Sequence, residues 1–168
     1  MMENGIAAEA RRRLVEVGGR TSQDLGLGRI VGQMLVYLYL RDGEVSLDEI
    51  GANLGLSKAA VSVAARQLES LGLLRRSWKK GDRKSYYRTP DNIAMALQQG
   101  LFRFVNQRIY AVGSELEHVH SLLESSEADA GRDKESDFLR SRVKRAKQLH
   151  DRAARLLNNP LLKMLAKS

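Results

Sequence analysis

Residues 46–90 have the sequence SLDEIGANLGLSKAAVSVAARQLESLGLLRRSWKKGDRKSYYRTP, and this segment predicts the central architecture of the chain. Ser46, with Glu49 three positions later, forms the capping-box pattern that begins a helix. Gly55 ends that short helix, and Ser57 is a favourable N-cap for another one. Two helices joined by a turn of about three residues that contains Gly predict a helix-turn-helix.

The second helix of this pair, expected at residues 58–71, separates into two faces. Its apolar residues recur at helical spacing and predict an inward face, which consists of Val61, Ala64, Ala65, Leu68 and Leu71. The opposite face carries small, hydroxyl and basic side chains, which are Lys58, Ala59, Ser62, Val63 and Arg66. Small residues near the helix start allow the backbone to approach DNA, and the polar groups can bond base edges or phosphates. We therefore predict that this helix, capped by Ser57, enters the major groove of DNA.

After Gly72 the sequence pattern changes from helical to strand-like. Residues 73–78 and 85–89 are two β-prone runs around a Gly-Asp turn, which predicts a β-hairpin. The tip of this hairpin is strongly basic and contains Lys79, Lys80, Arg83 and Lys84. A helix-turn-helix followed by a basic hairpin predicts a winged helix, in which these four residues contact DNA.

Positive charge is concentrated in the same segment. Residues 57–90 contain nine Lys or Arg against two acidic residues, whereas the preceding 56 residues contain six against eight. Because a structural role alone gives no reason for such clustering, the charge favours double-stranded DNA as a partner. Two alternatives remain open: an architectural DNA-binding protein without a specific operator, and a winged-helix module that binds protein.

These motifs resemble those of the MarR-type regulators. Residues 57–62 match the S-x-x-x-V-S pattern of that family, and residues 68–74 match its L-E-x-x-G-L-[VL] pattern. The wing at residues 80–87 and the segment 28–32 are more similar to the GbsR branch. Many MarR-type proteins carry Arg where this chain has Val63, so one base or phosphate contact is expected to be missing.

The resemblance implies a winged helix-turn-helix regulator that binds a pseudo-palindromic operator as a homodimer and represses a small set of genes. It leaves open control by a small-molecule effector, bound in the crevice between the dimer helices and the winged domain. Relatives of the GbsR type respond to choline-like osmolytes through aromatic contacts. That ligand does not transfer to this chain, because no aromatic residues cluster on the expected dimer helices.

The segments that precede the helix-turn-helix are also predicted to be helical. Residues 6–17 have apolar positions at helical spacing, and residues 18–22, which begin with two glycines, predict a break. Residues 28–40 predict a helix that packs behind the helix-turn-helix. Val45 predicts a short strand that can join the wing.

The C-terminal third predicts two long helices. Apolar residues keep helical steps of three and four over residues 93–123 and again over residues 138–157. A helix of about 30 residues cannot bury its apolar stripe against one small winged domain, so it needs a partner helix. We therefore expect a mainly α fold with a small β-hairpin, in three regions: an N-terminal helical arm at 1–24, the winged helix-turn-helix domain at 25–92 and a helical dimerisation region at 93–168.

This C-terminal third is also polarised in charge. Residues 91–131 contain two basic and six acidic residues, and residues 132–168 contain eleven basic and four acidic residues. Two interpretations remain open: the acidic and basic helices pair with each other, or the basic helix offers a second surface to DNA. Pairing is favoured, although exposed ion pairs contribute only about 0–1 kcal/mol each.

The sequence gives no support to several other classes of protein. There is no Cys, which excludes disulfides and thiolate metal sites. His118 and His120 are two residues apart, so they point away from each other on a helix and cannot share a metal. Because phosphate-binding and nucleophile motifs are also missing, we expect no enzymatic activity, no cofactor and no metal. The lack of an apolar span and of a signal peptide predicts a cytoplasmic protein with no membrane partner.

Overall fold

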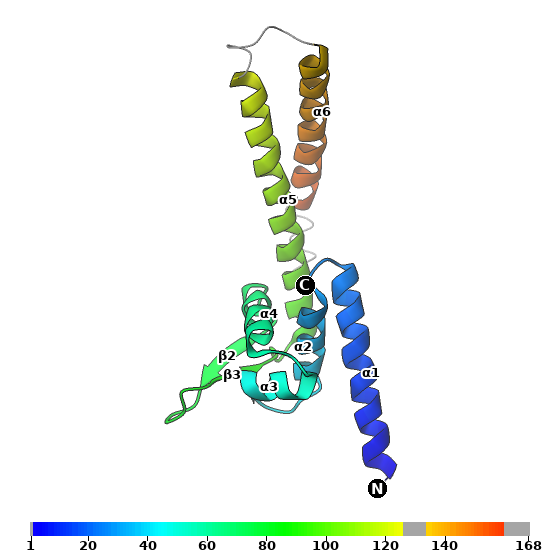
Figure 1. The fold of residues 1–168 in the computed structure, drawn as a ribbon, viewed down its shortest axis with the longest axis vertical. Coiled ribbons are helices and arrows are strands. Elements are labelled where there is room, and N and C mark those ends of the chain that lie inside the picture. Colours follow the sequence, from blue (N-terminus) through cyan, green and yellow to red (C-terminus); the bar gives the residue numbers. More distant parts are fainter. Residues whose placement is uncertain (1, 126–133, 160–168) are drawn as a thin grey trace. The chain divides into compact units, whose positions relative to one another are not determined.

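The computed structural model describes residues 2–125 and 134–159, and it confirms the expected class, mainly helical with a small β-sheet. From the N-terminus to the wing the elements are α1 (Met2–Asp24), α2 (Arg29–Tyr39), β1 (Val45–Ser46), α3 (Leu47–Leu54), α4 (Lys58–Ser70), β2 (Arg75–Trp78) and β3 (Ser85–Arg88) (Figure 1). Two long helices follow, which are α5 (Ile93–Ser125) and α6 (Lys134–Leu157). The chain divides into two compact units, Met1–Gly100 and Leu101–Ser168. The division into an arm, a winged domain and a dimerisation region stays a prediction.

Local sequence signals set the bounds of α3 and α4. Ser46 Oγ accepts a hydrogen bond from the Glu49 backbone N–H at 3.3 Å. Ser57 Oγ accepts one from the Ala60 backbone N–H at 3.2 Å. Gly55 follows α3 in the left-handed conformation with a φ of 65°, which favours glycine. Both predicted N-caps and the predicted end of α3 are therefore confirmed.

Helix α4 packs its apolar face into the core of the first unit. All five residues that were predicted to face inward are buried, with at most 2% of their surface exposed: Val61, Ala64, Ala65, Leu68 and Leu71. Helices α2 and α3 contact α4 and contribute the fully buried Met34, Leu38 and Ile50. Because this face is fixed inward, the opposite face of α4 is fixed outward.

A three-stranded antiparallel sheet, in the order β1-β3-β2, attaches the wing to this core. Tyr87 on the central strand pairs with Val45 of β1 and with Arg76 of β2. Tyr87 and Val45 are both buried, so apolar contacts hold the base of the hairpin while its tip projects from the sheet (Figure 1). The prediction that Val45 joins the wing is confirmed.

The predicted break at residues 18–22 is wrong, because α1 continues through it to Asp24. The two glycines serve close helix packing instead of ending the helix. A Cβ on Gly18 would collide with Val36 of α2, and a Cβ on Gly19 would lie 2.7 Å from Gln33 Cγ. From the other side, a Cβ on Gly32 of α2 would collide with the Gly18 carbonyl group. The packing of α1 against α2 therefore outweighs the low helix propensity of glycine.

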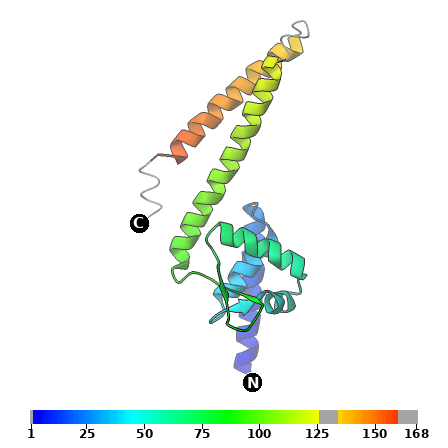
Figure 2. The same cartoon turned by 90° about the vertical axis from the view of Figure 1, so that its left-hand side faces the viewer.

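The second unit contains an antiparallel pair formed by the C-terminal part of α5 and by α6 (Figure 2). Arg140 Nε donates a hydrogen bond to the Leu123 carbonyl oxygen at 3.2 Å. Further along the pair, His150 Nε2 lies 2.8 Å from the Ile109 carbonyl oxygen, and this contact raises the pKa of His150. Gly113 leaves room for the imidazole, because a Cβ there would lie 2.7 Å from His150 Nε2.

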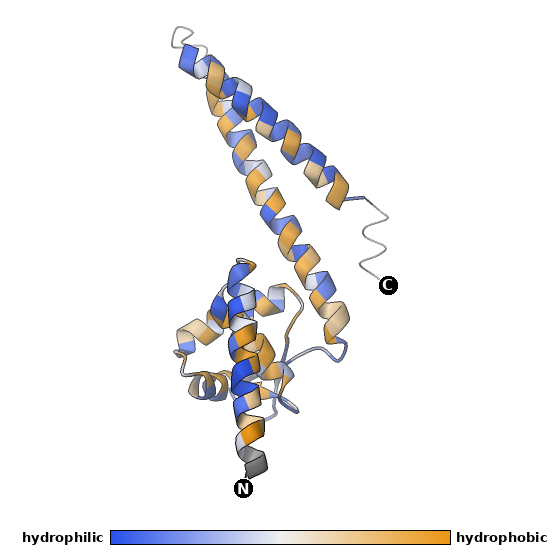
Figure 3. Cartoon of the chain, turned by 90° about the vertical axis from the view of Figure 1, so that its right-hand side faces the viewer, coloured by the Kyte–Doolittle hydropathy of each residue, from blue (hydrophilic) through white to orange (hydrophobic). Residues whose placement is uncertain are grey.

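Charge pairing and exposed apolar surface both occur on this helix pair. Glu117 of α5 forms an ion pair with Lys147 of α6, and the contact raises the pKa of Lys147. This contact favours the interpretation in which acidic and basic helices pair. Figure 3 shows hydrophobic positions recurring along both helices, and the exposed ones include Tyr110, Val112, Phe138, Leu149 and Leu156.

Candidate nucleic-acid interface

The outward face of α4 begins with a basic residue and continues with small ones. Lys58 is the first residue of the helix, and its side chain is 75% exposed. Ala59 and Val63 are exposed beside it, and Ser62 is partly exposed one turn further along. Arg66 follows after another turn, and among the described residues its side chain has no hydrogen-bond or ion-pair partner. The arrangement leaves hydroxyl and guanidinium groups free on a rigid helix whose inner face is buried.

Asp82 stabilises the turn at the tip of the wing. Its Oδ1 accepts a hydrogen bond from the Lys84 backbone N–H at 2.9 Å, and its Oδ2 accepts one from Tyr86 Oη at 2.6 Å. The Tyr86 hydrogen bond is the main cause that lowers the pKa of Asp82, and it raises the pKa of Tyr86. Gly81 next to it has a φ of 84°. The one acidic residue of the wing tip is therefore a structural part of the turn.

The basic side chains of the wing fall into two groups. Lys79 Nζ lies 4.0 Å from the centroid of the Tyr86 ring, so a cation–π contact orders this side chain. Lys84 Nζ lies near the carboxylate of Asp48, a residue of α3. Lys80 and Arg83 are exposed and have no partner among the described residues. The wing therefore presents two unpaired cations at its tip.

Asp48, in the first turn of α3, connects α4 to the wing. Its Oδ1 lies 3.0 Å from Lys58 Nζ, and its Oδ2 lies 3.9 Å from Lys84 Nζ. The structure thus brings together two residues that the sequence placed on different elements, and it adds an acidic residue that the sequence analysis did not include. The only signal in the sequence was an Asp in a capping box, which is typical of any helix start.

Other residues of the wing were also missed by the sequence analysis. Arg76 extends over the ring of Trp78, with 4.9 Å between its Cζ and the ring centroid, and Trp78 is 67% exposed. Arg75 and Arg88, by contrast, both form ion pairs with Asp91, at 3.5 Å and 2.6 Å. Arg76 and Trp78 therefore extend the exposed surface of the wing, while the other two arginines tie the hairpin to the segment that follows it.

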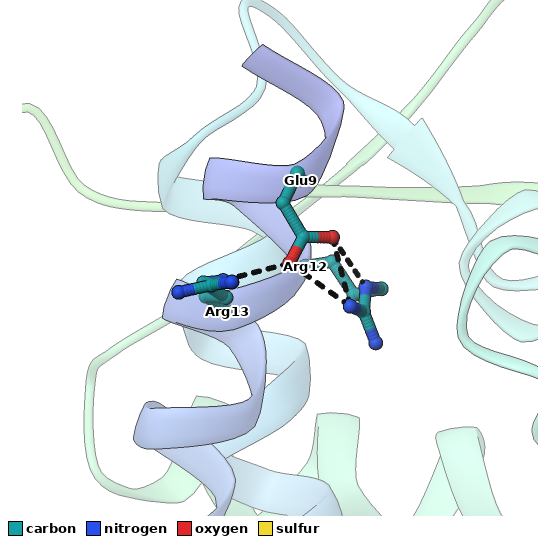
Figure 4. A network of polar contacts seen from close by, with 3 residues as sticks. All are labelled: Glu9, Arg12 and Arg13. Carbon is teal, nitrogen blue, oxygen red and sulfur yellow. Dashed lines mark hydrogen bonds and ion pairs between the residues drawn. The ribbon is translucent and has the colours of Figure 1, made fainter. Parts of the chain in front are cut away.

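Residues 11–13 of α1 are three consecutive arginines, and two of them bind a neighbouring carboxylate. Arg12 Nε and Arg13 Nε donate hydrogen bonds to Glu9, at 2.9 Å and 2.7 Å (Figure 4). These contacts, the Arg13 hydrogen bond foremost, lower the pKa of Glu9. All three side chains lie on the solvent side of the helix. The run is thus a solvated face in which both signs of charge are present.

Residues 2–125 and 134–159 contain no group of three or more His, Asp or Glu side chains that could hold a metal ion. None of the helices in these ranges is long and apolar enough to cross a membrane.

Comparisons with known proteins agree with the winged helix-turn-helix fold. The model of the MarR family matches residues 25–85. The HTH-type transcriptional repressor GbsR of Bacillus subtilis (strain 168) is 30% identical over 76 residues, which are 45% of this chain and 42% of that protein. A crystal structure described as that of a transcriptional regulator superposes with a TM-score of 0.62 at 23% identity, over 92% of this chain and 97% of the other. The first two matches confirm the resemblance inferred from the sequence, and the third shows the shared fold.

Proposed function

We propose that this chain, in which residues 25–85 form a MarR-type winged helix-turn-helix domain, is a transcriptional regulator that binds double-stranded DNA. Members of that family are transcriptional regulators and not enzymes, which agrees with the expectation from the sequence. In finer detail, the chain acts as a homodimer that represses a small set of genes from a pseudo-palindromic operator. Repression, and not activation, is supported by the 30% identity to a transcriptional repressor, which extends over 76 residues of this chain.

One observation carries this proposal: unpaired cations lie on both of the rigid elements that a winged helix offers to DNA. Arg66 on α4, and Lys80 and Arg83 at the tip of the wing, are exposed and lack partners among the described residues. They belong to a segment with nine basic and two acidic residues, and one of those two, Asp82, is engaged in its own turn. Such a surface gains free energy by releasing the counterions of a polyanion.

The two elements have different tasks in the proposed complex. Helix α4 lies in the major groove, where Ser62 and Arg66 reach base edges and the small Ala59 permits close approach. Lys58, at the N-terminus of that helix, binds phosphate. The wing binds the sugar-phosphate backbone and the minor groove through its basic residues, which are Lys79, Lys80, Arg83 and Lys84.

The surface of helices α5 and α6 supports the proposal of a homodimer. Helices α5 and α6 leave large apolar side chains exposed along their length, among them Phe138 at 59% and Leu149 at 69% exposure. Many exposed large apolar side chains on one pair of helices indicate an interaction surface, and a second copy of the same helices is complementary in charge as well. Two copies related by two-fold symmetry require inverted half-sites about one helical turn apart, or ~10 bp from centre to centre.

Control by a small molecule forms part of the same proposal. The first unit has an open cleft of about 580 Å³ between α1, α2 and α3, whose lining combines apolar residues such as Val15 and Leu54 with charged ones such as Arg12, Glu16 and Arg41. This volume is within the range that small ligands occupy. An effector changes DNA affinity only by binding the DNA-competent and the other dimer shape unequally, so operator DNA must alter the thermal shift that the ligand produces.

Footprinting of the purified protein on genomic DNA tests the proposed function against its alternatives. A regulator protects a few discrete sites, each with inverted half-sites. Even coverage of the DNA would instead favour an architectural protein. No binding to any duplex at low or high salt would favour a winged-helix module that binds protein.

A further inference from the structure

Asp48 lies between the two elements that the proposed function assigns to DNA. One carboxylate oxygen is 3.0 Å from Lys58 Nζ at the start of α4, and the other is 3.9 Å from Lys84 Nζ on the wing. The lysine side chains are 75% and 57% exposed and that of Asp48 is 47% exposed. All three charged groups are therefore accessible to a ligand that approaches this surface.

We propose that Asp48 is a positioning residue that sets DNA specificity, because it weakens binding to non-operator DNA more than it weakens binding to the operator. The inference rests on the proposed function and names a residue that acts through Lys58 and Lys84 instead of touching bases itself. It predicts that the wild-type protein discriminates between the two kinds of DNA better than a variant without this carboxylate.

Asp48 weakens binding to non-operator DNA because its carboxylate and a DNA phosphate compete for the same lysines. A phosphate that binds Lys58 or Lys84 approaches ammonium groups that already face the carboxylate of Asp48. The carboxylate repels the phosphate, so part of the attraction of each lysine is lost. Binding to random sequences depends almost entirely on phosphate contacts, so the loss falls most heavily there.

On the operator the same carboxylate also has a favourable effect. It holds two flexible lysines, from different elements, near one point, so less side-chain freedom is lost when phosphates at the matching separation arrive. Base contacts from Arg66 and Ser62 then add free energy that does not depend on Asp48. The net effect of the carboxylate is therefore smaller on the operator than on random DNA.

The two neighbouring acidic residues do not share this arrangement. Asp82 is committed to the wing turn through Tyr86 Oη at 2.6 Å. Glu49 lies in the same turn of α3 as Asp48, but its nearest basic group is Arg41 at 3.8 Å. Glu49→Gln therefore makes the same change in net charge on the same helix end without freeing Lys58 or Lys84.

The test compares Asp48→Asn with Glu49→Gln and wild type, by measuring affinity for an operator duplex and for a random duplex over a series of salt concentrations. Asp48→Asn should strengthen binding to random DNA by about three- to tenfold, with a smaller change on the operator and a salt slope steeper by about one unit per subunit. Glu49→Gln should leave both affinities within about twofold of wild type. Adding Lys58→Gln to Asp48→Asn should remove most of the gain, because the freed lysine is then absent.

Three outcomes would overturn the inference. Equal effects of the two single variants would mean that only net charge matters. Weaker binding of Asp48→Asn to both duplexes, with an unchanged thermal unfolding curve, would mean that the carboxylate assists binding. Loss of the folded state in Asp48→Asn, while the Lys58→Gln single variant binds as wild type does, would mean that Asp48 serves stability alone. A wild-type protein that binds neither duplex would overturn the proposed function itself, which is a separate result.

Discussion

At the scale of single residues, we propose Arg66 as the side chain that reads a base. It lies on the exposed face of α4 two turns from Lys58, and no described residue occupies its guanidinium group. Arg66→Ala should weaken operator binding by about 1–3 kcal/mol and relax the preference for one base in each half-site. Affinities for a set of operators with single substitutions measure both effects.

Arg66→Lys is the matched variant for this prediction. Lysine keeps the charge but loses the planar fork that bonds two acceptors of guanine at once. The lysine variant should therefore recover affinity for random DNA and still fail to recover the base preference. Full recovery of the preference by lysine would show that Arg66 contacts phosphate only.

At the scale of secondary-structure elements, the close packing of α1 on α2 depends on glycines. Gly32→Ala places a Cβ against the Gly18 carbonyl group and against Ser22, so the two helices must separate. We expect this variant to lose about 1–3 kcal/mol of unfolding free energy, as overpacked cores do. Urea unfolding followed by circular dichroism measures the loss.

Gly5→Ala supplies the control, because the added Cβ would meet nothing within 4 Å beyond its own stretch of helix, and the residue is also helical. Alanine is a better helix former than glycine, so this variant should be unchanged or slightly more stable. If Gly32→Ala proved as stable as Gly5→Ala, close packing would not explain why α1 continues through its glycines.

Elements with local signals were predicted correctly from the sequence, and so was the pairing of Val45 with the wing, but the full length of α1, which depends on its contacts with α2, was not. The caps at Ser46 and Ser57, and the two faces of α4, depend on residues a few positions apart, and all were confirmed. Continuation of α1 past Gly18 depends on Val36 of another helix, which the local pattern does not contain. The glycine pair was therefore interpreted as a break.

The candidate site, too, could be predicted from the sequence only in part. The basic residues of α4 and the wing could be listed from the sequence because charge clustering is visible there. The sequence could not show which of these basic side chains lack an ion-pair partner, because the partners are set by the fold. Asp91 binds Arg88 at 2.6 Å, and Asp48 binds Lys58 at 3.0 Å. The structure thereby distinguishes cations that already contact a group within the fold from those that have no partner among the described residues.

At the scale of the whole molecule, we predict a dimer at micromolar concentration. The exposed apolar side chains of α5 and α6, such as Leu149 and Leu156, need a partner surface to leave water. Sedimentation equilibrium should give a mass near twice 18.8 kDa. A monomer with a cooperative melt would instead make these helices a self-contained hairpin.

We propose above all that the wing binds phosphate, and the salt dependence of DNA affinity tests this contact. The variant to use is Lys80→Ala with Arg83→Ala, because neither side chain has a partner among the described residues whose loss could disturb the fold. The control is Arg12→Ala with Arg13→Ala, which removes the same charge from α1, where both groups bind Glu9.

The measurement is the slope of log affinity against log salt for operator and random DNA. The wing variant should weaken binding to both duplexes by similar factors and flatten the slope by about one to two units per subunit, because fewer counterions are released. The α1 control should keep the wild-type slope. A wing variant with an unchanged slope would contradict the account, because the basic hairpin would then not be in contact with phosphate.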